Sequence, residues 1–470
     1  MVFSSLVFLC VFLPLVLIGH TAIPNRKVRN ALLLVTSLLF YAYGEPVYVL
    51  LMLGSALFNY LITLWLDKSR SKLLLAVAVI VNIGILGLFK YTGFLVDSVN
   101  DLLHLSIPVP QIALPIGISF FTFQALSYVV DVYRRQAPVQ RNYGKLLLYI
   151  SFFPQLIAGP IVRYSDIAQQ IDERTVDTQN IAFGMRRFVA GLGKKVLISN
   201  AMGAVADQIF GHGGELNMVA AWIGAIAYLM QIYYDFSGYS DMAIGLGKMF
   251  GFRFRENFRF PYIATSIQEF WRRWHISLSS CFRDYVYIPL GGNRKGRART
   301  ILNRLIVFFL TGLWHGANWT FVVWGMFHGL FLLLEEALPF LRKLPKALGH
   351  IYTLLLVTVG FVVFRADSIA QAWQFVGAMF TGFDFSPAAM TVGVQALTPY
   401  FLVMLVAAIL CAGPFAGLVE RVRALEGKCQ LTQKETIVQN VCFALAFALL
   451  AWCVIRLTGG SYNPFIYFRF

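Results

Sequence analysis

The dipeptide Trp-His occurs twice in this chain, at residues 274–275 and again at 314–315. No Lys, Arg, Asp or Glu lies between Arg304 and Glu335, so His315 belongs to a long run without formal charge. A polar side chain in such a run is expected at membrane depth, where it is costly and usually marks a functional site. Imidazole titrates near neutrality and can accept a proton from a hydroxyl substrate. His315 is therefore the first candidate for a catalytic residue.

The neighbours of His315 favour a functional site over a histidine that is simply hydrogen-bonded inside a helix bundle. Gly312 and Gly316 flank it, and glycines let helices approach closely or bend. Trp314 and Asn318 add polar groups beside it, so both are candidates to bind a substrate or cofactor.

His328 is the next histidine along the chain. In one continuous helix it would lie about 20 Å from His315, on a nearly opposite face. A direct partnership would require a break in the helix at residues 316–318. We therefore expect a structural role for His328.

Residues 251–300 form the most basic segment of the chain, and aromatic residues are interleaved with the charges. On a helix, Trp271, His275 and Leu278 would share one face, which predicts an amphipathic helix at the membrane surface. Arginine binds phosphate through two hydrogen bonds at once, so a phosphate-rich cofactor is one expected ligand of Arg272 and Arg273. Anionic lipid is the alternative. The charged residues are Arg253, Arg255, Arg259, Arg272, Arg273, Arg283, Arg294, Lys295, Arg297 and Arg299, against Glu256, Glu269 and Asp284.

The elements that must position these residues are membrane helices. The chain is 58% hydrophobic and 13% charged, and stretches of about 20 apolar residues, enough to cross a bilayer, recur along it. We predict an all-α, polytopic bundle of about 11 spans in one integral domain over residues 1–470. Spans are expected within 2–23, 30–44, 46–66, 73–96, 112–132, 181–210, 218–250, 301–313, 318–338, 350–365, 398–419 and 437–457.

Two other stretches interrupt the apolar pattern. Residues 152–160 are apolar but contain two prolines, which indicates a re-entrant turn shielded by protein. Residues 233–241 carry Asp235 and Asp241 within an apolar region.

The net charge of +16 is concentrated in loops such as Arg26–Arg29. Because positive loops face the cytoplasm, we expect that loop inside, and a multi-pass membrane protein in contact with lipid. The glycines form no nucleotide-binding motif, and a basic face on a membrane protein is not expected to bind nucleic acid. None of the six cysteines forms a CxxC pair, so we expect neither a metal site nor a disulfide framework.

Several longer motifs resemble the membrane-bound O-acyltransferases, in particular the bacterial branch that contains the alginate O-acetylase. The resemblance covers nearly the whole chain. It is carried by Trp274-His275, by Leu313-Trp314-His315-Gly316, and by the runs at 114–124, 157–161, 234–241 and 285–293.

The resemblance implies a function and roles for particular residues. His315 takes the place of the family's catalytic histidine, and His275 takes its second polar position. The family fold implies a central funnel entered from the cytoplasm. Together with the residue arguments above, this makes five residues the candidates to bind the acyl donor, namely Arg272, Arg273, Trp274, Trp314 and Asn318. The expected donor is acetyl-coenzyme A, with no permanently bound cofactor. The expected activity is O-acetylation of an exopolysaccharide at the bacterial inner membrane, with alginate as the first candidate, through a periplasmic partner that carries a nucleophilic serine.

Three other functions remain open at this point. Within the enzyme class, the acetylated polymer can be cellulose or peptidoglycan. A transporter of a lipid-linked sugar would show duplicated halves with broken helices, and no such duplication is present. A non-catalytic scaffold for polymer secretion would not need His315, so substitution of that residue separates it from an enzyme.

Overall fold

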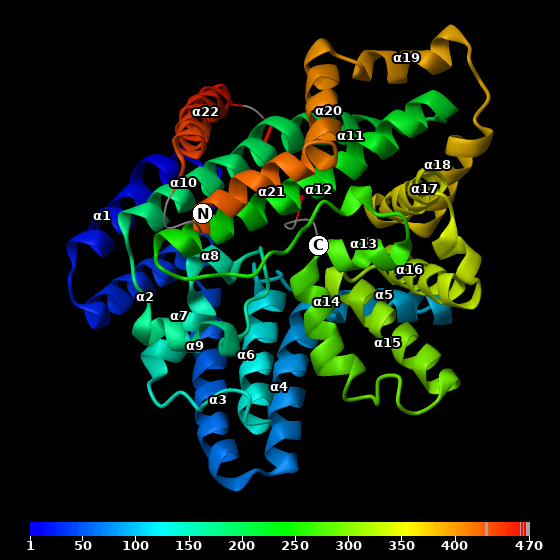
Figure 1. Ribbon diagram of the computed structural model, residues 1–470. Coiled ribbons are helices and arrows are strands. Elements are labelled where there is room, and N and C mark those ends of the chain that lie inside the picture. Colours follow the sequence, from blue (N-terminus) through cyan, green and yellow to red (C-terminus); the bar gives the residue numbers. More distant parts are fainter. Residues whose placement is uncertain (428–430, 461, 464, 467–470) are drawn as a thin grey trace. The chain divides into compact units, whose positions relative to one another are not determined.

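The computed structural model spans the 470-residue chain and describes residues 1–427, 431–460, 462, 463, 465 and 466. Within these residues the regular structure is helical throughout, without strands, which confirms the all-α prediction (Figure 1). Cys429, one of the six cysteines, lies outside the described residues. The chain divides into two compact units: residues 1–188 with 240–255, and residues 189–239 with 256–470. The helices α10 (Thr178–Gly193) and α12 (Met218–Met249) contribute to both. The single domain over residues 1–470 stays a prediction.

The first unit is built on α3, α4 and α6, which pack side by side (Figure 1). The helices α2 and α3 of this unit are separated at Gly44-Glu45-Pro46, which agrees with the boundary between the predicted spans 30–44 and 46–66. The helices are η1 (Phe8–Phe12), α1 (Leu13–Ala22), α2 (Arg26–Ala42), α3 (Tyr48–Ser69), α4 (Lys72–Lys90), α5 (Thr92–Leu103), α6 (Ile118–Tyr133), α7 (Tyr143–Ser151), α8 (Phe153–Leu156) and α9 (Tyr164–Glu173).

Residues 152–160 of this unit are buried throughout and contain only the short helix α8. The rest of the segment is irregular, as its two prolines predict. Gly117, at a φ of +78°, permits the close approach, because a Cβ there would lie 2.8 Å from the carbonyl oxygen of Leu156. Protein therefore shields this irregular backbone, which is the condition for such a turn at membrane depth.

The second unit contains the helical hairpin α15–α16 and the elements packed on it. α17 lies against α16, and the short helix α13 contacts both. The remaining helices are η2 (Lys194–Ser199), α11 (Asn200–Phe210), η3 (Pro261–Ile263), α13 (Ile267–Arg273), α14 (Ile276–Phe282), η4 (Arg283–Tyr287), α15 (Arg297–His315), α16 (Trp319–Ala337), η5 (Pro339–Lys343), α17 (Lys346–Arg365), α18 (Ile369–Thr381), α19 (Pro387–Ala396), α20 (Pro399–Ala412), α21 (Ala416–Ala424), η6 (Leu425–Gly427) and α22 (Gln433–Thr458).

Five helices among the described residues are long and apolar enough to cross a membrane, namely α3, α4, α16, α17 and α22, or six if the bent pair α19–α20 is one span. The predicted count of about eleven is therefore not confirmed. Several predicted spans are shorter or more polar than a full crossing. The stretch 2–23 is divided between η1 and α1, α6 has 16 residues, and α15 carries three arginines in its first half.

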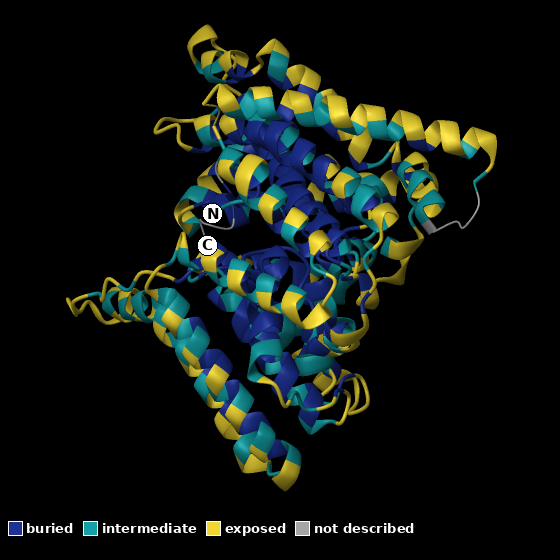
Figure 2. Ribbon diagram, turned by 90° about the vertical axis from the view of Figure 1, so that its left-hand side faces the viewer, coloured by how far each residue is buried: buried dark blue, intermediate teal, exposed yellow. Residues whose placement is uncertain are grey.

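Large apolar side chains remain exposed on several of these helices, where yellow positions alternate with buried ones (Figure 2). On α4, only 17% of the apolar window is buried within the protein. Leu73 and Ile80 of that helix are 73% and 68% exposed. Contiguous apolar surface of this kind suits contact with lipid, which agrees with an integral membrane protein.

Candidate active site

The hairpin of α15 and α16 positions His315. α15 ends at His315, and α16 begins after Asn318, so the chain does break at residues 316–318. The two helices approach very closely, because a Cβ at Gly312 would lie 2.4 Å from the carbonyl oxygen of Phe321, and one at Gly325 would lie 2.3 Å from that of Phe308. The prediction that glycines allow close approach here is confirmed.

His315 is 7% exposed and surrounded by aromatic rings. Its ring centroid lies 5.0 Å from that of Trp324, 5.2 Å from that of Phe364, and 6.3 Å from that of His275. Beside it is a cavity of about 10 Å³, roughly the space of one water. The lining residues are Ile232, Phe236, Trp274, His315, Trp324, Phe361, Phe364 and Ile466. An imidazole in such an apolar, enclosed site is protected from bulk water.

His275 is fully buried between α13 and α14, in the left-handed conformation at a φ of 44°. Its Nδ1 lies 3.1 Å from Oδ1 of Asn257, and the same Oδ1 accepts hydrogen bonds from the backbone N–H and the hydroxyl of Ser277, at 3.2 and 2.8 Å. Because a backbone N–H can only donate, Asn257 presents its oxygen here, and His275 must carry its proton on Nδ1.

This arrangement leaves Nε2 of His275 as the unprotonated nitrogen of a neutral ring. Among the residues that the structure describes, Nε2 has no hydrogen-bond partner. Burial, and secondly the neighbouring His315, hold the pKa of His275 well below its ordinary value. His275 is thus a neutral imidazole with a lone pair available for a proton or for a substrate donor. Asn257, which fixes this tautomer, was not predicted from the sequence.

The predicted continuous amphipathic helix through Trp271, His275 and Leu278 is wrong. α13 ends at Arg273, and α14 begins at Ile276. The backbone at residues 257–259 replaces the missing helical bonds: the carbonyl of Asn257 accepts the N–H of Ile276 at 2.9 Å, and the N–H of Arg259 donates to Arg273 at 3.0 Å. All three residues of the predicted face are buried inside the protein instead of lying on its surface.

The structure brings four of the predicted site residues together, namely Trp274, His275, Trp314 and His315. Trp274 lines the cavity with His315. The Trp314 ring lies 5.6 Å from that of His275. These residues come from α15 and from the junction of α13 and α14, which are far apart in the sequence.

Arg272, Arg273 and Asn318 do not line the cavity. Arg272 is exposed, and Arg273 pairs with Glu269 at 2.9 Å. The Asn318 side chain caps α16 by accepting the N–H of Thr320 at 3.0 Å, and it donates to the carbonyl of Asp367 at 3.0 Å. Asn318 therefore has a structural role in the hairpin turn.

His328 lies on α16, one ring beyond Trp324. The Trp324 centroid lies 5.0 Å from that of His315 and 5.2 Å from that of His328, so the indole separates the two histidines. His328 is fully buried and packs edge-on against Trp271 at 5.3 Å. It is therefore not a direct partner of His315, and a structural role in the aromatic packing remains the prediction.

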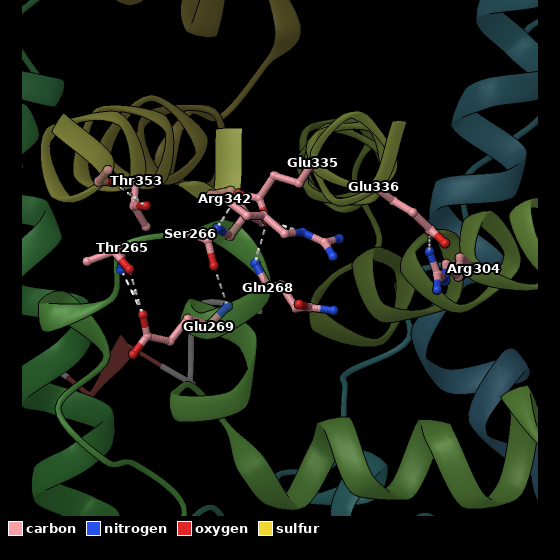
Figure 3. Close-up of polar contacts among 11 residues, drawn as sticks. Thr265, Ser266, Gln268, Glu269, Arg304, Glu335, Glu336, Arg342 and Thr353 are labelled. Carbon is pink, nitrogen blue, oxygen red and sulfur yellow. Dashed lines mark hydrogen bonds and ion pairs between the residues drawn. The ribbon is translucent and has the colours of Figure 1, made fainter. Parts of the chain in front are cut away.

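The carboxylate of Glu335, near the end of α16, holds the start of α13 (Figure 3). Glu335 is fully buried and accepts the backbone N–H groups of Ile267 and Gln268 at 2.6 and 3.1 Å. The Ser266 hydroxyl accepts a third N–H, from Glu269, at 3.1 Å. An acid at a helix N-terminus satisfies otherwise unpaired donors and complements the helix dipole. The same helix that faces His315 thus also fixes α13, which leads into Trp274 and His275.

A buried ion pair holds the wall of the cavity on another side. Nζ of Lys195 lies 2.6 Å from Oδ1 of Asp235, and both side chains are at most 3% exposed. Oδ2 of Asp235 accepts the backbone N–H of Ile466 at 2.8 Å. Ile466 lines the His315 cavity. Asp235, which the sequence marks only as an acid in an apolar region, is therefore a positioning residue for this segment.

The helical architecture, the apolar spans and the enclosed histidine pair are those of an integral membrane enzyme. The chain belongs to the membrane-bound O-acyltransferase family, whose model matches residues 71–366. It is accordingly an O-acyltransferase, as the sequence motifs indicated.

The chain is similar in sequence to several proteins with named functions. The chain is 42% identical to the probable alginate O-acetylase AlgI of Pseudomonas putida, over the full length of both proteins. It is 45% identical to the probable alginate O-acetylase AlgI of Pseudomonas aeruginosa, over 81% of this chain and 75% of that protein. It is 35% identical to the peptidoglycan O-acetyltransferase of Helicobacter pylori, over 81% of this chain and 80% of that protein.

Proposed function

We propose that this O-acyltransferase acetylates alginate at the bacterial inner membrane, with His315 as the catalytic residue. The observation that carries the proposal is the pair of buried histidines, in which His315 lines a small apolar cavity and His275 lies 6.3 Å from it between ring centroids. The full-length similarity to proteins named as alginate O-acetylases supports alginate as the polymer that is acetylated. The peptidoglycan O-acetyltransferase of Helicobacter pylori supports peptidoglycan as the second candidate.

In this proposal His315 acts as a general base toward an acceptor hydroxyl, or as a transient acyl carrier. As a base it would take the hydroxyl proton while the oxygen attacks the thioester carbonyl and the thiolate leaves. His275 is neutral, and its hydrogen bond to Asn257 keeps the ring proton on Nδ1. It would therefore accept or relay a proton through Nε2. The apolar walls would keep water from hydrolysing the thioester.

Acetyl-coenzyme A is the proposed donor, reaching the site from the cytoplasm. Coenzyme A thioesters are cytoplasmic, whereas the proposed acceptor is outside the membrane, so a mid-depth histidine would connect the two sides. The predicted contact of Arg272 and Arg273 with donor phosphates remains part of the proposal. Of the two, Arg272 is exposed and Arg273 is already paired with Glu269.

Complementation tests the polymer. The chain is expressed in an alginate producer that lacks its own alginate O-acetylase, and acetyl esters are measured on alginate and on peptidoglycan. We expect alginate esters to return to at least about half of the parental level, with peptidoglycan unchanged. Restoration of peptidoglycan esters alone would replace alginate by peptidoglycan as the substrate.

A periplasmic partner with a nucleophilic serine is proposed to collect the acetyl group. The cavity beside His315 has about 10 Å³, the space of about one water, so a sugar chain does not fit there. Purified chain with acetyl-coenzyme A and alginate alone should give little product, and addition of a periplasmic extract from the alginate producer should raise it about tenfold or more. Efficient acetylation in the three-component mixture would rule out the relay.

A further inference from the structure

A polar pocket of about 370 Å³ lies in the first unit, where residues 169–175 meet residues 248–253. Its lining includes three cations, Arg174, Lys248 and Arg253, against one carboxylate, Glu173. The volume falls within the range of small-ligand pockets in proteins. None of the sequence motifs pointed to this pocket, and of its three cations only Arg253 belongs to the basic segment 251–300.

Arg174 is the unusual member of this group. It is 7% exposed, and no carboxylate in the described part of the chain lies within ion-pair distance of it. Its guanidinium is fixed by hydrogen bonds from Nε to the Phe250 carbonyl at 3.0 Å and from Nη1 to the Ile171 carbonyl at 3.1 Å. It also lies 4.5 Å above the Phe252 ring. Nη2 has no hydrogen-bond partner within the described residues.

The surroundings of Arg174 add positive charge. Burial first, and then the charges of Arg26 and Arg29, lower the pKa of Arg174 to about 10, and Asp172 opposes them. Buried charges in proteins are normally paired or bound to a counter-ion. A buried guanidinium with cationic neighbours therefore favours an anion in the adjoining pocket.

The backbone at Gly251 allows residues 250–253 to lie close to Arg174 and Thr175. Gly251 has a φ of +83°, and a Cβ there would lie 2.8 Å from the carbonyl oxygen of Thr175. Only glycine lets residues 250–253 turn tightly against Arg174. The start of α2, which carries Arg26 and Arg29, lies against the other side of the pocket, since the Asn30 side chain donates to the carbonyl of Ile171 in α9 at 3.0 Å. The basic residues Arg26–Arg29 are those predicted to face the cytoplasm.

We propose that this pocket binds a phosphate group, presented either by an anionic lipid headgroup or by a soluble phosphate compound of the cytoplasm. Phosphate oxygens accept charge-assisted hydrogen bonds from lysine and arginine, and Lys248 and Arg253 are the two cations that line the pocket besides Arg174. The proposal does not depend on the acetyl transfer proposed above.

Binding to the purified full-length protein in detergent tests this site, with calorimetry as the readout. One arm titrates adenosine 3′,5′-bisphosphate, and the other titrates dihexanoylphosphatidylglycerol against dihexanoylphosphatidylcholine. Saturable binding in the first arm identifies a soluble phosphate ligand, and a preference for phosphatidylglycerol identifies a lipid headgroup. Arg174 is too deeply packed for a clean substitution, so the variants are placed at Lys248 and Glu173.

The variants are chosen to move affinity in opposite directions. Loss of a charge-assisted hydrogen bond in Lys248→Gln should weaken binding about tenfold. Removal of the pocket's carboxylate in Glu173→Gln should strengthen it a few-fold. Lys68→Gln, at an exposed lysine on α3 outside the pocket, is the matched control and should change nothing. Absence of binding by either probe at millimolar concentration overturns the proposal. So does a shift of both pocket variants in the same direction, or an effect no larger than that of the control.

Discussion

The variant His315→Ala is expected to lose acetyl transfer by a factor of about 10² to 10⁴, the usual contribution of a general acid–base group. The rate should fall rather than the affinity for donor, because the role proposed for the imidazole is in the transition state. Acetyl esters on the polymer in cells, together with the rate of thioester consumption by purified protein, measure the loss. Either catalytic mode assigned to His315 requires this result.

Removal of a buried ring can also destabilise the protein, so the experiment includes two controls. His315→Gln keeps most of the volume and a polar end but cannot act as a base near neutral pH. It should be as inactive as His315→Ala, with normal abundance in the membrane. His212→Ala, at an exposed histidine in the loop after α11, should retain full activity. Near-normal acetylation in both His315 variants would show that His315 is not the catalytic residue.

The helices and their breaks could be predicted because they depend on local sequence. The run from Arg304 to Glu335 predicts two apolar helices, and the glycines around His315 indicate where the hairpin turns. The boundary between the predicted spans 30–44 and 46–66 depends on local sequence in the same way, and α2 and α3 are indeed separated at Gly44-Glu45-Pro46. The number of crossings could not be predicted in this way, since an apolar stretch such as 112–132 yields a helix of only 16 residues.

The parts of the site that escaped prediction depend on contacts between distant residues. Asn257 reaches His275 across 18 positions, and Glu335 reaches Ile267 across 68. The conformation of His275 follows from backbone pairing with residues 257–259, which overrides the local helical pattern. Hydropathy and motif spacing carry no information on such pairings.

Charge alone was also an incomplete guide to binding. The sequence marks residues 251–300 as basic, but it does not show which charges are already paired. Arg273 is bound to Glu269, and Arg255 lies 2.5 Å from Asp166. Arg174 lies outside the basic segment, and the sequence does not show that Arg26 and Arg29 add positive charge around its buried guanidinium.

The second large effect is expected at the buried pair of Lys195 and Asp235. Removal of one partner from a buried ion pair leaves an uncompensated charge and typically costs about 3–5 kcal/mol, whereas replacement of both by apolar groups is often near neutral. We therefore expect Asp235→Leu and Lys195→Met each to lower the thermal unfolding midpoint in detergent strongly. The double variant Lys195→Met with Asp235→Leu should recover most of that loss. Equal loss in the single and double variants would contradict the ion pair.

A second double variant separates stability from the positioning of the cavity wall. In Lys195→Met with Asp235→Asn, the amide oxygen can still accept the N–H of Ile466, as Oδ2 of Asp235 does at 2.8 Å. In Lys195→Met with Asp235→Leu that acceptor is gone, so Ile466 loses its anchor beside His315. At matched unfolding midpoints, the asparagine form should retain most of the rate of acetyl transfer. The leucine form should lose a factor of about ten or more, because Ile466 then lacks the hydrogen bond that positions it in the cavity wall. Equal activity in the two double variants would mean that Asp235 contributes only to stability.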